Sequence, residues 1–177
     1  QLLRRRLDQL SSGSPTADLG DILVFAGPGA GKTLGALLGF SSMRREGHLD
    51  QFVVFCHRTS ILEQWKQAAA GLGLCLKEWP CTDAAAKAAD GLLVTYQGAG
   101  RQLKPLQQQL GQLQADRCMA IADEAHHLGL DPEDPKAPAW GQTFQALTES
   151  FRLRVGLTGT PFRADNLGFC AACLLYT

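Results

Sequence analysis

The chain has 177 residues and a mass of 19.1 kDa, enough for about one domain with a sizeable core. Hydrophobic residues make up 45% and charged residues 19%, a composition that excludes a disordered or fibrous protein. Because 17 Lys and Arg balance 17 Asp and Glu, contact with a nucleic acid must be local rather than due to bulk charge. Without a long apolar run or a secretion signal, we expect a cytoplasmic protein that has no membrane contact.

The first half of the chain alternates between strand and helix patterns. Short apolar runs predict strands, and the segments between them predict helices of which the second carries a plausible capping box. The predicted strands are 21–26, 52–56, 72–79 (the weakest) and 91–95, and the predicted helices are 32–40, 60–70 and 83–89. Residues 41–50 are predicted to be a polar connection.

The second half continues the alternation. Leucines at helical spacing predict a helix over 103–113 with a glutamine-rich solvated face. A strand over 118–122, a surface loop over 129–138, a helix over 140–150 and a strand over 151–157 follow. Six strands interleaved with helices predict an α/β fold: a parallel β-sheet with helices on both faces, a three-layer sandwich. In such sheets ligands bind beyond the carboxyl ends of the strands.

The strongest local motif directly follows the first predicted strand and opens a helix. Its glycines allow backbone N–H groups to turn onto an anion at the positive end of the helix. Lys32 would reach the β- and γ-phosphates of a nucleotide, and the Thr33 hydroxyl would bind Mg²⁺. The predicted ATP-binding residues are Ala26, Gly27, Pro28, Gly29, Ala30, Gly31, Lys32 and Thr33, with Ala26 where the common pattern has glycine.

An acidic pair ends the fifth predicted strand. Phosphoryl transfer needs a carboxylate for Mg²⁺ and a second group that orients the attacking water. We assign Asp123 to the metal and Glu124 to the general base, with Lys32 as the third catalytic residue. His126 is interpreted as a polar link between the nucleotide site and the next strand, not as a metal ligand.

The six cysteines are not predicted to form a metal site. Cys56 and Cys118 lie in apolar runs that are typical of buried thiols. Cys170 and Cys173 have half of a zinc-site spacing, but no second pair completes it.

Three motifs in order resemble those of the superfamily-2 helicases and translocases. They are the phosphate-binding loop at 26–33 (the phosphate loop), the DEAH sequence at 123–126 and the TGTP sequence at 158–161. The resemblance covers about residues 21–162 and implies a RecA-like P-loop domain, ATP and Mg²⁺ as cofactors, and motion on a nucleic acid. In this family, residues matching His126, Thr158 and Thr160 couple hydrolysis to strand movement.

The motif sequences DEAHH and LTGTPFR resemble those of the DNA-acting branch, which includes restriction-enzyme motor subunits and repair helicases. That branch implies contacts with the nucleic-acid backbone, more with DNA than with RNA. The candidate contacts are polar residues after the second and fourth predicted strands, namely Arg58, Thr59, Thr95, Tyr96 and Gln97.

We divide the chain into an N-terminal helix and linker (1–20), a RecA-like ATP-binding domain (21–165) and a tail of unknown role (166–177). The resemblance implies a second RecA-like domain in the parent protein, without which hydrolysis should be slow. The expected function is the motor domain of an ATP-dependent DNA helicase or translocase. The alternatives are an RNA helicase domain and a nucleotide- or nucleic-acid-binding module that is inactive without a second domain.

Overall fold

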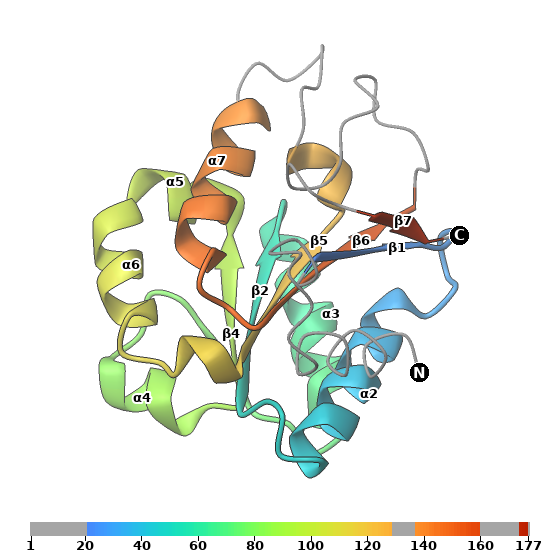
Figure 1. The fold of residues 1–177 in the computed structure, drawn as a ribbon, viewed down its shortest axis with the longest axis horizontal. Coiled ribbons are helices and arrows are strands. Elements are labelled where there is room, and N and C mark those ends of the chain that lie inside the picture. Colours follow the sequence, from blue (N-terminus) through green and yellow to red (C-terminus); the bar gives the residue numbers. More distant parts are fainter. Residues whose placement is uncertain (1–20, 129–136, 160–173, 177) are drawn as a thin grey trace.

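The computed structural model of the protein describes residues 21–128, 137–159 and 174–176, and within them a single seven-stranded sheet is covered by helices (Figure 1). Its strands are β1 (Asp21–Phe25), β2 (Gln51–Cys56), β3 (Leu76–Glu78), β4 (Gly91–Thr95), β5 (Cys118–Asp123), β6 (Leu153–Thr158) and β7 (Leu174–Tyr176). They lie in the order β3-β4-β2-β5-β6-β1-β7, and every neighbouring pair is parallel. The predicted parallel α/β sheet is confirmed.

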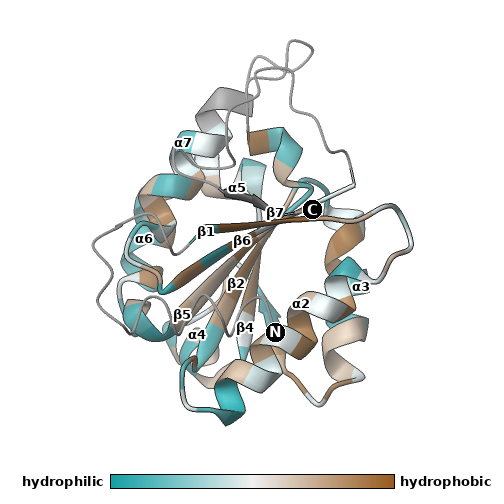
Figure 2. Cartoon of the chain, turned by 45° about the vertical axis from the view of Figure 1, so that its right-hand side comes forward, coloured by the Kyte–Doolittle hydropathy of each residue, from teal (hydrophilic) through white to brown (hydrophobic). Residues whose placement is uncertain are grey.

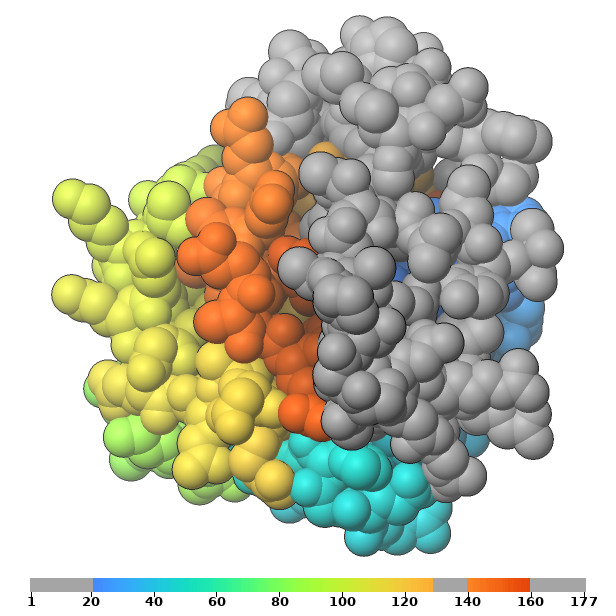
Figure 3. Space-filling view, in the orientation of Figure 1, coloured from blue at the N-terminus to red at the C-terminus, as the bar shows by residue number. Residues whose placement is uncertain are grey.

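Helices cover both faces of the sheet, as the three-layer prediction requires. The α-helices are α2 (Lys32–Arg45), α3 (Thr59–Ala70), α4 (Asp83–Ala88), α5 (Tyr96–Arg101), α6 (Leu103–Leu110) and α7 (Ala137–Thr148), and the short 3₁₀ helices are η1 (Ala115–Arg117) and η2 (Ala125–Leu128). Helices α2 and α3 lie on one side, and α4 to α7 lie on the other (Figure 1). In the space-filling view, α7 packs beside the α6 segment (Figure 3).

Alternate residues of each central strand supply the two halves of the core. In β2, Val53 and Phe55 face the cluster under α5 to α7, whereas Phe52 and Val54 face the cluster under α2 and α3. A strand that buries both faces must be apolar throughout, and the central strands are largely hydrophobic (Figure 2).

The register brings the carboxyl ends of five strands to one edge. Paired positions near these ends are Phe25 with Thr158, Asp123 with Leu157, Phe55 with Ala122, and Cys56 with Thr95. The motifs that follow β1, β2, β4, β5 and β6 therefore meet at this edge, which we call the carboxyl edge.

Between β1 and α6, three elements differ from the sequence prediction. Helix α2 continues to Arg45 through residues predicted as a polar connection, because Met43 is buried and extends the helix's apolar face. Strand β3 is only three residues long. Helix α5 was not predicted, since its two glycines lower helix propensity; the Thr95 hydroxyl starts it by accepting from the Gly98 N–H at 3.0 Å.

The predicted division of the chain is described only in part. Residues 1–20 lie outside the described residues, as do 160–173. Within the predicted tail, Leu174–Tyr176 forms β7, which extends the sheet beyond β1 (Figure 1). Part of the segment interpreted as a tail of unknown role is therefore an edge strand of the sheet.

Candidate nucleotide site

The phosphate loop connects β1 to α2 and turns tightly on glycines. Gly29 and Gly31 have φ angles of 74° and 76°, in the left-handed region that residues with a side chain rarely adopt. The Ala30 N–H donates to the Gly27 carbonyl at 3.2 Å, and Gly31 directly precedes the first turn of α2. The loop thus leads into a helix N-terminus, where free N–H groups favour an anion.

Lys32 is the first residue of α2 and its side chain folds back over the loop. Its ammonium group donates to the carbonyl oxygens of Ala26 at 2.8 Å and Gly27 at 3.3 Å. A Cβ atom added at Gly159 would lie 3.5 Å from the Lys32 nitrogen, so the residue after β6 closely approaches the loop. The motifs after β1 and β6 are therefore adjacent around this lysine.

Asp123 ends β5 and is held on both carboxylate oxygens. The Trp65 indole N–H donates to Oδ2 at 2.9 Å, and the Glu124 backbone N–H donates to Oδ1 at 3.1 Å. Burial raises the pKa of this carboxyl, the Trp65 hydrogen bond lowers it, and the charge of Glu124 raises it. Only 7% of the residue is exposed. The side chain therefore has a fixed orientation.

Glu124 turns the chain out of the sheet. Its φ of 49° is in the left-handed region, which is strained for a residue with a side chain. This conformation places Glu124 with Asp123 on the wall of a cleft of about 500 Å³. The remaining lining residues are Pro28, Gly29, Ala30, Gly31, Lys32, Thr33, Leu34, Ile61, Gln64 and Ala68.

The cleft brings together the residues predicted for phosphate, metal and water. Lys32, Thr33, Asp123 and Glu124 all line it, although the first two begin α2 and the other two are the last residue of β5 and the residue after it. The donor set suits Mg²⁺, which uses one or two protein carboxylates or hydroxyls together with phosphate and water oxygens. Thr33 and Asp123 are the two side chains that would hold it.

His126 links two of the motifs. Its Nδ1 lies 3.3 Å from the Thr158 hydroxyl at the end of β6 and 3.3 Å from Oε2 of Glu124. The histidine therefore contacts both Glu124, on the wall of the cleft, and the last residue of β6. Thr160, the other predicted coupling residue, lies outside the described residues.

The predicted nucleic-acid contacts separate into exposed and buried groups. Arg58 and Thr59 are exposed at the start of α3. Thr95 and Gln97 are half-buried, and the Thr95 hydroxyl caps α5. Tyr96 is only 2% exposed and its hydroxyl donates to the Asp123 backbone carbonyl at 2.9 Å. Its interpretation as a nucleic-acid contact is corrected: the side chain lies in the core and braces the end of β5.

Sequence reasoning missed the contributions of α3 to this site. Trp65 contacts the Asp123 carboxylate, while Ile61, Gln64 and Ala68 line the cleft. The helical spacing of 61, 64, 65 and 68 after a strand end was the available signal. This spacing does not reveal that α3 lies beside α2, which only the fold shows (Figure 1).

A ring cluster braces the other side of the same edge. The His57 and His127 rings stack with centroids 4.2 Å apart, and Trp140 of α7 lies 5.1 Å from His57. Trp140 also stacks on Tyr96 at 5.9 Å. These contacts join the residues after β2, β4 and β5 to one helix, so the carboxyl edge is supported as a unit.

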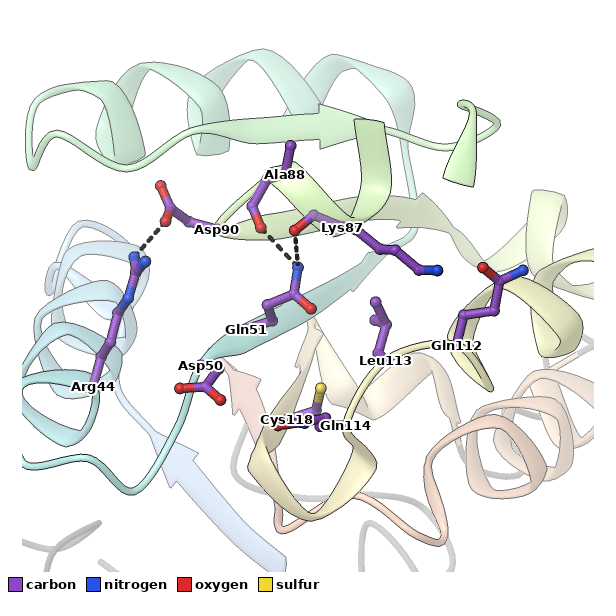
Figure 4. Close-up of a pocket in the computed structure, with 11 residues that line it drawn as sticks. Arg44, Asp50, Gln51, Lys87, Ala88, Asp90, Gln112, Leu113, Gln114 and Cys118 are labelled. Carbon is purple, nitrogen blue, oxygen red and sulfur yellow. Dashed lines mark hydrogen bonds and ion pairs between the residues drawn. The ribbon is translucent and has the colours of Figure 1, made fainter. Parts of the chain in front are cut away.

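The opposite edge of the sheet has a polar hollow of about 350 Å³ (Figure 4). Arg44 and Asp90 form an ion pair across it, and the Gln51 amide donates to the carbonyls of Ala86 and Ala89 at 3.0 and 2.8 Å. These groups hold α2 and α4 to the sheet, and they lie away from the carboxyl edge.

Cys56 and Cys118 are free and buried, as predicted, and burial raises the pKa of both thiols to about 12. Across the part of the chain that the structure describes, no helix combines the length and apolar character needed to span a bilayer.

Known proteins resemble this chain in sequence and in fold. Uncharacterised proteins of Mycobacterium leprae and Mycobacterium tuberculosis are 31% and 30% identical over 148 residues, which are 82% of this chain but 23% of theirs. The chain thus spans about a quarter of these relatives.

Among solved structures, the SWI2/SNF2 ATPase core of Sulfolobus solfataricus in complex with double-stranded DNA superposes with a TM-score of 0.58 at 21% identity, covering 90% of this chain and 30% of that chain. The UvsW helicase of bacteriophage T4 also gives 0.58, at 14% identity, covering 90% and 51%. These likenesses confirm the predicted RecA-like fold.

The model of the family described as "Type III restriction enzyme, res subunit" matches residues 3–163, most of the chain. This match confirms the resemblance to restriction-enzyme motor subunits among superfamily-2 proteins. The chain therefore belongs to the type III restriction enzyme res subunit family, whose members carry helicase-like ATPase motor domains.

Proposed function

We propose that this chain binds and hydrolyses ATP as the first motor domain of a DNA helicase or translocase. The observation that supports this most is the convergence of Lys32, Thr33, Asp123 and Glu124 on one cleft. Few other reactions need a phosphate-binding loop, a buried carboxylate and a second carboxylate within the same space.

Each side chain has one task in this mechanism. The loop N–H groups and the Lys32 ammonium hold the phosphates, and Lys32 exchanges its carbonyl partners for phosphate oxygens when nucleotide enters. Thr33 and Asp123 would hold Mg²⁺, which would supply positive charge to neutralise the phosphates. Glu124 orients a water in line with the γ-phosphate and accepts its proton.

His126 couples this site to strand β6. His126 contacts both Glu124 and Thr158. A movement of Glu124 after phosphate release therefore also moves His126, the hydrogen-bond partner of Thr158 at the end of β6. Thr158 leads into residues 159–161 of the TGTP sequence, which resembles the coupling motif of the family. Through these contacts, ATP hydrolysis would lead to movement of the segment after β6.

The nucleic acid is proposed to lie along the carboxyl edge, over the start of α3. Exposed Arg58 and Thr59 supply donors there, and the helix N-terminus adds backbone N–H groups. Contacts of this kind go to phosphates, so little sequence preference is expected. DNA is favoured over RNA by the DEAHH and TGTPFR wording and by the DNA bound to the SWI2/SNF2 neighbour.

A second RecA-like domain is proposed to complete the site. The chain covers about a quarter of its relatives' length, and 30% and 51% of the two solved structures, which leaves room for such a domain in the whole protein. An arginine from that domain would accelerate hydrolysis by about 10³–10⁵-fold, by analogy with GTPases.

ATP turnover by the full-length protein, with and without single-stranded DNA, double-stranded DNA and RNA, tests the proposal. Stimulation by DNA supports the proposed function. Stimulation by RNA alone favours the RNA helicase alternative. Turnover indifferent to all three polynucleotides would remove the motor assignment and leave the nucleotide chemistry. Nucleotide binding without turnover would favour the inactive module.

A further inference from the structure

A buried tryptophan ties α3 to the metal-side carboxylate. Trp65 is fully buried in the cluster under α2 and α3, yet its indole N–H donates to Oδ2 of Asp123 at 2.9 Å. The two residues are 58 positions apart in the sequence. An indole N–H can only donate, so its burial requires an acceptor, and here the acceptor lies on the wall of the nucleotide cleft.

Packing alone does not require this residue. The buried face of α3 consists of Leu62, Trp65 and Ala69, and aliphatic side chains satisfy such a face. The indole adds a directed bond to one oxygen, while the Glu124 N–H holds the other. Two donors on two oxygens fix the plane of the carboxylate. Hydrogen bonds that orient a metal-ligating group typically contribute 10- to 100-fold to metal affinity.

The same helix begins at the proposed nucleic-acid contact. Arg58 and Thr59 are exposed at its N-terminus, and Trp65 follows about two turns later, roughly 10 Å along the axis. Between them, Ile61 and Gln64 line the cleft. A helix moves as a rigid rod over this length, so a shift at its first turn displaces the indole and the carboxylate together.

We propose that Trp65 is a positioning residue that orients Asp123 for Mg²⁺, and that through it α3 transmits the binding of a nucleic-acid backbone at Arg58 and Thr59 to the nucleotide cleft. The inference rests on the proposed function, and it adds both a residue and a route to it.

The first test is the Mg²⁺ dependence of nucleotide affinity in Trp65→Phe, which removes the N–H and keeps an aromatic ring. Dissociation constants of a non-hydrolysable ATP analogue are measured in Mg²⁺ and in EDTA. We expect the variant to lose about tenfold of the enhancement by Mg²⁺ and to match the wild type in EDTA. Trp79→Phe is the matched control, because Trp79 is also buried but packs on the other face of the sheet.

An unchanged Mg²⁺ enhancement in Trp65→Phe would overturn the positioning role, and so would an equal loss of affinity in EDTA, which indicates a structural effect. Should Trp65→Phe fold poorly, 3-benzothienylalanine at position 65 replaces the N–H with sulfur in nearly the same volume. A wild type that binds no nucleotide in either condition would instead refute the proposed function, and this inference with it.

The second test measures the same affinity in Mg²⁺ with and without a DNA oligonucleotide. In the wild type we expect DNA to change it severalfold, the usual size of coupling between two sites. Arg58→Ala should lose this response and keep the Mg²⁺ enhancement, whereas Trp65→Phe should lose both. A DNA response that survives in Trp65→Phe, or that is absent from the wild type, would overturn the route through α3.

Discussion

The imidazole of His126 lies 3.3 Å from the hydroxyl of Thr158, although the two residues are 32 positions apart and belong to different strand ends. Because the same nitrogen is 3.3 Å from Glu124, one ring connects the proposed base to the strand that leads into the proposed coupling motif. Binding and coupling should therefore be separable by substitution at this residue.

His126→Ala should leave nucleotide affinity within about twofold of the wild type, since the histidine is not among the residues that line the cleft. Turnover in the full-length protein should fall about tenfold, because a lost hydrogen bond of roughly 1.4 kcal/mol is a factor of ten. Steady-state ATP hydrolysis beside nucleotide titration checks this. His48→Ala is the control, because His48 lies just beyond the C-terminal end of α2, away from the cleft.

Lys32→Ala should weaken nucleotide binding by about 10- to 100-fold, because a charge-assisted contact to phosphate contributes roughly 1.5–3 kcal/mol. Isothermal titration with an ATP analogue measures it. Lys66→Ala is the matched control, since Lys66 lies on α3 and pairs with Glu78 at 2.9 Å. Equal affinity in the wild type and Lys32→Ala would contradict the phosphate role.

Glu124→Gln should retain nucleotide binding and abolish measurable turnover, because the amide has the same shape but cannot accept the proton of the attacking water. Binding and hydrolysis are measured on the same preparation of the full-length protein, with Glu63→Gln on the exposed side of α3 as control. If Glu124→Gln and Lys32→Ala lost binding equally, the assignment of the base would be wrong.

Arg154→Ala should lower the free energy of unfolding by about 3 kcal/mol, because it leaves the Asp21 carboxylate buried without its partner. Asp21 is 1% exposed, and Arg154 donates to its Oδ2 at 2.9 Å; the two residues are paired in the sheet, at the first position of β1 and the second position of β6. Urea denaturation measures the loss.

Arg44→Ala is the control for that experiment, because the Arg44 side chain is 45% exposed in its ion pair with Asp90. We expect a loss below about 1 kcal/mol for an exposed pair. Similar losses in both variants would contradict the importance of burial at Asp21.

Stability should fall as the pH rises above about 9. Burial raises the pKa of the Cys56 and Cys118 thiols from 9.0 to about 12. A folded pKa above the unfolded value means that the contribution is complete below pH 9 and is lost as the pH rises towards 12. At pH 10, each thiol should lower the free energy of unfolding by about 1 kcal/mol relative to its value below pH 9.

Urea denaturation at pH 8 and pH 10 checks this pH dependence, and Cys56→Ala/Cys118→Ala is expected to show a smaller decrease than the wild type. The same burial predicts that an alkylating reagent at pH 8 modifies exposed Cys75 and spares Cys56 and Cys118 until the chain unfolds. Rapid modification of all three in the folded protein would contradict it.

Features that depend on neighbours along the chain could be predicted from the sequence. The glycines, Lys32 and Thr33 of the phosphate loop fall within eight residues, and the acidic pair directly follows an apolar strand. Parallel strands end at a common edge, so the position of both motifs followed from the alternation of strands and helices. Burial of Cys56 and Cys118 followed equally from the apolar runs around them.

Contacts between residues far apart in the chain depend on the fold and could not be predicted in this way. The strand order places β2 and β6 on either side of β5, so Trp65, after β2, reaches Asp123, and Thr158, at the end of β6, reaches His126. It also turned Tyr96 into the core, because α5 starts at that residue and α7 packs over it. Such contacts depend on strand order and helix packing, which local propensity and spacing do not encode.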